Sequence, residues 1–221
     1  GDQYTLGIPY PATAPVVGKT TDASGLTGSF KYCHTFLSED GWESAPGETL
    51  LFTQIDLSGE RGDITLPALP AGMVKVYTYR TIDHGSDYYK VHEGAGGSFS
   101  DTTTDLDIQT GKVMDTLNFL PPPDEGKYLC EVNGTFFLAV DDRIYYSEQG
   151  NPHAWPPLNW LNMPDTVTGL VEEFEGILAY TANATARITG YDALSITRQL
   201  IPTDQGCKNC RTISTITDAP I

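Results

Sequence analysis

The sequence is poor in basic residues and has no long apolar run. Its 221 residues include 13 lysines and arginines against 29 aspartates and glutamates, which gives a formal net charge of −16. A surface of that sign repels phosphates, so binding along a nucleic acid is not expected. No window approaches the roughly 18 consecutive apolar residues of a membrane span, and the first residues lack the basic and apolar parts of a signal peptide. We therefore expect no membrane insertion.

Cysteine is scarce, and the motifs of catalysis are missing. The four cysteines do not form the dense pattern of a disulfide-rich secreted domain. Cys207-Lys208-Asn209-Cys210 supplies only half of a four-ligand zinc site, or a redox pair without its usual setting, so an ordinary turn is favoured. The four histidines have no nucleophile motif beside them, and no glycine-rich phosphate loop precedes a helix. We predict that the protein is not an enzyme and has no cofactor, metal or small-molecule substrate.

Turn-forming residues are abundant, with 22 glycines and 15 prolines. This composition favours many short strands over long helices, so the predicted class is all-β. The alternation in Phe30–Phe36 predicts a central strand with one buried face. Further strands are expected at 49–55, 63–66, 75–81, 88–92 and 98–101. Roughly seven such strands over residues 18–120, after an extended segment 1–17, fit an immunoglobulin-like β-sandwich.

The inner faces of this sandwich are expected to be apolar and aromatic. Its core should draw on a subset of Phe30, Tyr32, Phe36, Leu66, Val76, Tyr77, Tyr79 and Val91. Two polar motifs lie beside these strands. Arg61-Gly62-Asp63 spells an adhesion tripeptide, for which a hairpin turn is the favoured interpretation. Residues 101–107 offer three carboxylates, for which a solvated loop leading to the last sandwich strand is favoured over a calcium site.

Pro121-Pro122-Pro123 cannot continue a sheet ladder and predicts a domain boundary. After it, residues 132–146 and 174–190 look alike, because each has a glycine turn, an apolar strand, a polar turn and an Arg-led strand. The period is that of a four-stranded propeller blade. In the second repeat, 166–173 is expected as the innermost strand and 196–201 as the outermost, and a third repeat is expected to begin at Cys207. Residues 121–221 are thus predicted to form an incomplete propeller-like array.

Several of these segments resemble one known family. Residues 25–32, 35–36, 41–46, 76–81 and 88–91 resemble the fibronectin type III-like domain of bacteriophage tail structural proteins. Residues 144–156, with Ser-Glu, Asn-Pro and Trp-Pro in succession, look like a segment of the same proteins, and residues 187–190 and 206–213 look like its continuation. The likeness covers nearly the whole chain, although its motifs are structural and not those of an active site.

The resemblance implies a virion protein of the tail tube or nozzle, made in the host cytoplasm. Such proteins assemble as rings with copies of themselves and other tail proteins, and DNA passes through without specific binding. Aromatic side chains dominate contacts between proteins, so the candidate interface residues are Trp42, Phe119, Tyr145, Trp155 and Trp160. Trp155 is also expected to pack between repeats.

Two other functions remain open. A receptor- or glycan-binding adhesion module is the main alternative, because sandwiches and propellers both present loops, with Trp155 or Trp160 as sugar contacts. A glycosidase is more distant. Ser147-Glu148-Gln149-Gly150 resembles the aspartate box of sialidase-like propellers, but Gln149 replaces the aspartate, and that box is itself structural.

Overall fold

The computed structural model describes residues 7–202 and 206–208. The chain divides into two compact units, Ile8–Leu120 and a second one that combines Gly1–Gly7 with Pro121–Ile221. We call them the sandwich unit and the repeat unit. The division falls where the proline run begins, and residues 8–17 group with the sandwich unit. The all-β prediction is confirmed, since the described residues form thirteen strands and one single-turn helix, α1 (Asp105–Ile108).

The sandwich unit contains one five-stranded antiparallel sheet in the order β4-β3-β1-β2-β5. Its strands are β1 (Val16–Ser38), β2 (Thr53–Leu66), β3 (Met73–Thr81), β4 (Tyr88–Gly94) and β5 (Gly97–Asp101). Phe30–Phe36 lies in the central strand β1, as predicted. The expectation of about seven strands is wrong. The segments expected at 49–55 and 63–66 are largely one strand, β2, which begins at Thr53 and has no turn between them.

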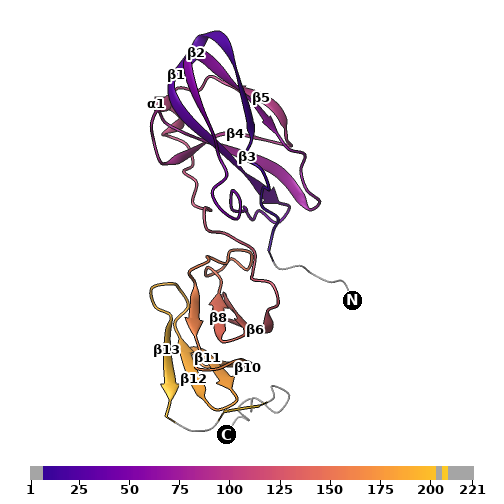
Figure 1. The fold of residues 1–221 in the computed structure, drawn as a ribbon, viewed down its shortest axis with the longest axis vertical. Coiled ribbons are helices and arrows are strands. Elements are labelled where there is room, and N and C mark those ends of the chain that lie inside the picture. Colours follow the sequence, from indigo (N-terminus) through magenta and orange to yellow (C-terminus); the bar gives the residue numbers. More distant parts are fainter. Residues whose placement is uncertain (1–6, 203–205, 209–221) are drawn as a thin grey trace. The chain divides into compact units, whose positions relative to one another are not determined.

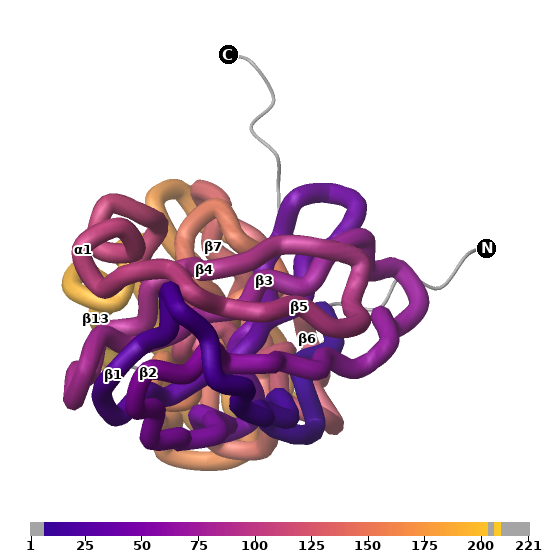
Figure 2. The backbone as a smooth tube through the Cα atoms, turned by 90° about the horizontal axis from the view of Figure 1, so that it is seen from above, coloured from indigo at the N-terminus to yellow at the C-terminus, as the bar shows by residue number. Residues whose placement is uncertain are grey.

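The sandwich unit is built on this single sheet, whose long central strand β1 serves both halves. The first part of β1 pairs with β2, and its last part, from Tyr32 onward, pairs with β3. The edge strands β4 and β5 are separated by only Ala95 and Gly96, although they lie at opposite ends of the strand order. So short a link holds the two edges close together. The sheet therefore curls round a common interior, as the view from above shows (Figure 2).

The predicted core is largely confirmed. Buried positions, each at most 5% exposed, are Phe30, Tyr32, Phe36, Leu66, Val76 and Tyr79. Tyr77 and Val91 are half-buried. Arg61-Gly62-Asp63 lies inside β2, where it pairs with both β1 and β5. It is therefore neither an exposed adhesion loop nor the hairpin turn that the sequence favoured.

The repeat unit consists of two four-stranded antiparallel sheets (Figure 1). The first sheet contains β6 (Lys127–Val132), β7 (Thr135–Val140), β8 (Arg143–Tyr146) and β9 (Trp160–Asn162). The second contains β10 (Val167–Glu173), β11 (Gly176–Thr181), β12 (Thr185–Thr189) and β13 (Thr197–Ile201). In each sheet the strands are arranged in chain order. The strands expected at 166–173 and 196–201 accordingly form the two edges of the second sheet.

The two sheets share one register. Phe137 pairs with Tyr146 in the first sheet, and Leu178 pairs with Arg187 in the second. Leu178 comes 41 residues after Phe137, and Arg187 comes 41 residues after Tyr146. The same displacement relates seven cross-strand pairs of the first sheet to seven of the second. Residues 41 apart therefore occupy matching positions, and the repeat seen in the sequence is a repeat of backbone hydrogen bonding.

The sheets pack face to face through opposite faces. We call the face with Phe137 the front of the first sheet and the face with Phe136 its back, because successive side chains alternate. By the 41-residue displacement, Leu178 marks the front of the second sheet and Ile177 its back. One buried cluster contains both Phe137 and Ile177, so the front of the first sheet packs on the back of the second. A propeller repeats this head-to-tail packing around its axis.

The start of the expected third repeat matches the start of the second. The backbone N–H of Val167 donates to the carbonyl oxygen of Asp141 at 2.8 Å, just beyond β7. The N–H of Cys207 donates to the carbonyl oxygen of Thr181 at 2.8 Å, at the end of β11. Cys207 lies 40 residues after Val167, and each of the two bonds to the end of the second strand of the sheet before it. Cys210 and the other residues of the predicted third repeat after Lys208 lie outside the described residues.

Candidate interaction site

The five aromatic residues proposed as interface anchors differ in accessibility. Trp155 is 3% exposed, and its indole Nε1–H donates to the carbonyl oxygen of Pro152 at 2.9 Å. The Trp155 side chain is therefore too buried to contact a partner protein. The other four, Trp42, Phe119, Tyr145 and Trp160, are half-buried. Trp42 lies in the turn after β1, where its backbone exchanges hydrogen bonds with Ser38, and the Phe119 carbonyl accepts from the N–H of Ala45.

Tyr145 and Trp160 belong to one apolar row on the back of the first sheet. The register places Leu129, Leu138, Tyr145 and Trp160 side by side across β6, β7, β8 and β9. Leu129 is 48% exposed, and the guanidinium of Arg143 lies 4.3 Å from the centroid of the Trp160 ring. We call these four residues the back row. Sequence reasoning identified its two aromatic members but missed the leucines, because cross-strand neighbours are set by register.

Part of the back row is covered by the chain that enters β6. Leu138 is only 8% exposed. A Cβ added to Gly126 would lie 2.5 Å from a Leu138 methyl carbon, so the backbone before β6 crosses this side chain. No residue with a side chain fits at position 126 without displacing Leu138. The accessible residues of the back row are therefore Leu129, Tyr145 and Trp160.

A second feature is an open groove at the hairpin ends of the two sheets, with a volume of about 1080 Å³. It is lined by Val132, Asn133, Glu172, Glu173, Phe174, Glu175, Thr189, Gly190 and Tyr191. The β10–β11 turn holds Phe174 at 84% exposure, and Tyr191 is 46% exposed. The Thr135 hydroxyl donates to the Tyr191 carbonyl oxygen, which fixes the segment after β12 against the first sheet.

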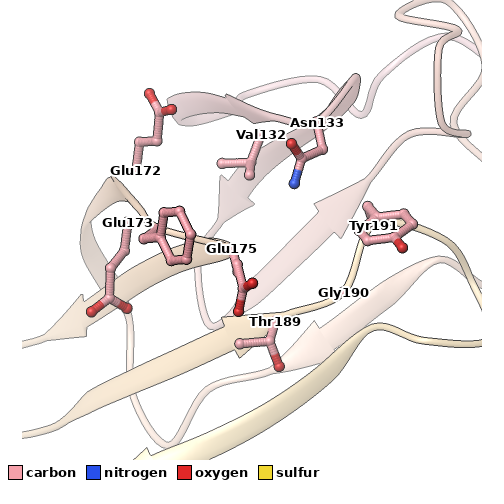
Figure 3. A pocket seen from close by; sticks show the side chains of 9 residues that line it. Val132, Asn133, Glu172, Glu173, Glu175, Thr189, Gly190 and Tyr191 are labelled. Carbon is pink, nitrogen blue, oxygen red and sulfur yellow. The ribbon is translucent and has the colours of Figure 1, made fainter.

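The groove is acidic, but its carboxylates point in different directions. The Glu175 side chain extends toward Thr189, whereas Glu172 and Glu173 point away from the middle of the groove (Figure 3). Glu173 accepts from the Arg187 guanidinium at 2.7 Å, so its charge is paired. The groove thus offers an aromatic ring beside a carboxylate.

The carboxylates of residues 101–107 have a structural role in the sandwich unit. Asp101 is 2% exposed and accepts from the Arg80 guanidinium at 2.8 Å and from the Tyr32 hydroxyl at 2.9 Å. Asp105, in α1, accepts from the other end of the same guanidinium at 2.9 Å. The expected solvated loop before a final strand is therefore wrong, because these residues follow β5 and neutralise a buried arginine. Burial, followed by the charge of Asp101, raises the pKa of Tyr32.

His34 is a further buried titratable group in this unit. It is 1% exposed, and neither ring nitrogen has a hydrogen-bond partner among the described residues. Burial lowers the pKa of His34 to about 4, because a charged imidazolium would lose its hydration. The unfolded chain takes up this proton near pH 6.5.

The free energy of unfolding should therefore fall by at most about 3 kcal/mol as the pH falls from about 6.5 to about 4. The reason is that the unfolded state binds the proton at a higher pH than the folded state does. His34→Leu should flatten this part of the pH dependence. Urea unfolding at a series of pH values measures it. His84→Leu is the control, since the His84 side chain is 81% exposed. Identical pH profiles for wild type and His34→Leu would contradict the assignment.

Among residues 7–202 and 206–208, no group of three or more His, Cys, Asp or Glu side chains is placed to hold a metal ion. No helix in the described part of the chain is long and apolar enough to cross a membrane. The fold defines an all-β protein in which a curled sandwich is joined to two matching four-stranded sheets. Comparison with protein-family models and with curated proteins gives no match.

Proposed function

We propose that this chain is a structural component of a bacteriophage tail, of the tube or nozzle type, that assembles with copies of itself and with other tail proteins. The observation that supports this most is the back row, an apolar and aromatic stripe on the first sheet in which Leu129 is 48% exposed and Tyr145 and Trp160 are half-buried. Partly exposed apolar faces of this kind mark sites of protein association. The segment 144–156, which resembles tail proteins, begins in β8 of the same sheet.

The charge of the chain supports the same function. A formal net charge of −16 disfavours phosphate contacts, which suits a wall past which DNA slides without being held. A tail tube that bound DNA through lysines and arginines would slow its passage. In this proposal the protein is made in the host cytoplasm and resides in the virion, and it needs neither a cofactor nor a catalytic residue.

Immunogold electron microscopy tests this function. Antibodies raised against the chain should label the tails of virions whose genome encodes it, and pre-incubation of the antibody with the free protein should abolish the label. Gold on no virion, or on capsids alone, would reject the tail assignment. Negative-stain images of the purified chain mixed with other tail proteins from the same genome should show rings or tubes.

The groove favours an adhesion module as a second candidate. Sugars present apolar C–H faces beside hydroxyls, and Phe174 next to Glu175 offers partners for both. Trp155 is unsuited to that role because it is buried. Saturable binding of a neutral glycan that Phe174→Ala abolishes, and that Leu194→Ala on an exposed site outside the groove preserves, would favour this candidate.

A further inference from the structure

The two sheets of the repeat unit carry different residues at the same hairpin turn. In the first sheet the turn between β6 and β7 is Asn133-Gly134, and both residues have positive φ, 52° and 82°. Asparagine and glycine are the residues that best tolerate this backbone conformation. The 41-residue displacement places Phe174 and Glu175 at the matching positions between β10 and β11. The two hairpins therefore share a pairing pattern but differ in the residues of the turn.

Phe174 and Glu175 are poor choices for the turn itself. Glu175 has a φ of 66°, a conformation in which a Cβ crowds the backbone, whereas Gly134 at the matching position has no Cβ. Phe174 replaces an asparagine and holds its ring 84% exposed. Both residues line the groove at the hairpin ends. Strained turns of this kind occur where a side chain serves a contact outside the turn, so the pair is explained by a ligand in the groove.

The charge of the groove indicates what that ligand is. No lysine, arginine or histidine is among the described residues that line it. Arg187, two residues before Thr189, is already paired with Glu173 at 2.7 Å. The Glu175 side chain extends toward Thr189 (Figure 3), and its carboxylate forms no ion pair with the described part of the chain. The groove therefore combines an exposed aromatic ring with a negative charge that a cation would neutralise.

We propose that the groove binds an arginine or lysine side chain of a different, basic tail protein, with the cation against the Phe174 ring and the Glu175 carboxylate. A cation is attracted by the face of an aromatic ring and by a carboxylate at the same time. The inference rests on the proposed function for its choice of a protein as partner. The formal net charge of −16 favours a basic protein over a second copy, because two copies repel each other.

The sandwich unit already contains the same combination with its cation in place. The Lys90 ammonium lies 4.4 Å from the centroid of the Tyr77 ring and donates to the Glu93 carboxylate at 2.8 Å. A ring and a carboxylate there hold one cation from two sides. In the groove the ring and the carboxylate are neighbours in sequence, and the volume of about 1080 Å³ admits a long side chain together with the backbone that carries it.

Fluorescence anisotropy with the full chain tests this proposal. The probe is a fluorescein-labelled peptide of alternating arginine and serine, and the comparison is the same peptide with glutamine in place of arginine. The arginine peptide should bind at least about tenfold more tightly at low salt. Phe174→Asn and Glu175→Gly should each weaken its binding about tenfold. Both variants introduce the residues of the first turn, so the urea midpoint should not fall, and weaker binding would not reflect unfolding.

Glu125→Gly is the matched control. Glu125 is also an exposed glutamate with positive φ, 63°, and it does not line the groove. The substitution therefore removes the same charge from the same kind of backbone position, and the variant should bind the arginine peptide as the wild type does. Equal weakening by Glu125→Gly and Glu175→Gly would show that net charge and not the groove binds the peptide. That result, or equal affinity for the two peptides, would overturn the proposal.

The peptide experiment and the immunogold experiment fail independently. Virions labelled by the antibody, together with a chain that does not distinguish the two peptides, would overturn only this inference. Arginine-selective binding in the groove of a chain that no virion contains would overturn only the tail assignment.

Discussion

Replacing Arg80 with methionine is expected to destabilise the sandwich unit by about 3–5 kcal/mol, because it leaves Asp101 charged, buried and without its cation. The Arg80 side chain is fully buried and its guanidinium holds two carboxylates, one in β5 and one in α1. It also lies 4.8 Å from the ring centroid of Phe30. The substitution should therefore destabilise β3, β5 and α1 together.

Urea unfolding of the full chain, together with hydrogen exchange of peptides from β3, β5 and α1, measures this effect. Arg61→Met is the matched control. The Arg61 side chain is 37% exposed and pairs with Asp22 and Asp63 at the surface, so its loss should cost less than about 1 kcal/mol. Adding Asp101→Asn to Arg80→Met should restore part of the stability, because the unpaired charge is then removed. A cost for Arg80→Met no larger than that of Arg61→Met would show that the pair is not buried as described.

Phe137→Ala is expected to cost the repeat unit about 3–5 kcal/mol, since it opens a cavity in the cluster shared by both sheets. Phe137 has no exposed surface, and its ring lies 6.3 Å from that of Tyr146. Because the front of the first sheet packs on the back of the second, the substitution should also weaken β11 and β12, which it does not alter in sequence.

Hydrogen exchange of the full chain separates the two sheets in one experiment. Peptides from β7 and from β11 should both exchange faster in Phe137→Ala than in wild type. Phe174→Ala is the control, because that ring is 84% exposed, and it should change stability by less than about 0.5 kcal/mol. Faster exchange confined to the first sheet would mean that the two sheets do not share one core.

Local pattern predicted much of this fold. The alternation of Phe30–Phe36 identified a central strand, and the Gly-strand-Arg-strand repeat after the prolines identified two similar sheets. These features depend on neighbouring residues, since turn residues and side-chain period act over a few positions. The pattern misled where a glycine stood inside a strand. Gly62 suggested a hairpin turn at Arg61-Gly62-Asp63, but pairing with β1 on one side and β5 on the other keeps Gly62 within β2.

The sequence by itself determined that this is a β protein with a boundary at the prolines and a repeat behind it, because composition, alternation and turns are local properties. Only the tertiary structure decided which face of each repeat strand is buried. Phe136 and Phe137 are both large and apolar, so alternation cannot predict which of them is buried. Phe137 is buried because the second sheet packs on it. The tertiary structure also decided the partners of Arg80, which lie 21 and 25 residues away in the sequence and are brought to Arg80 by the curl of one sheet.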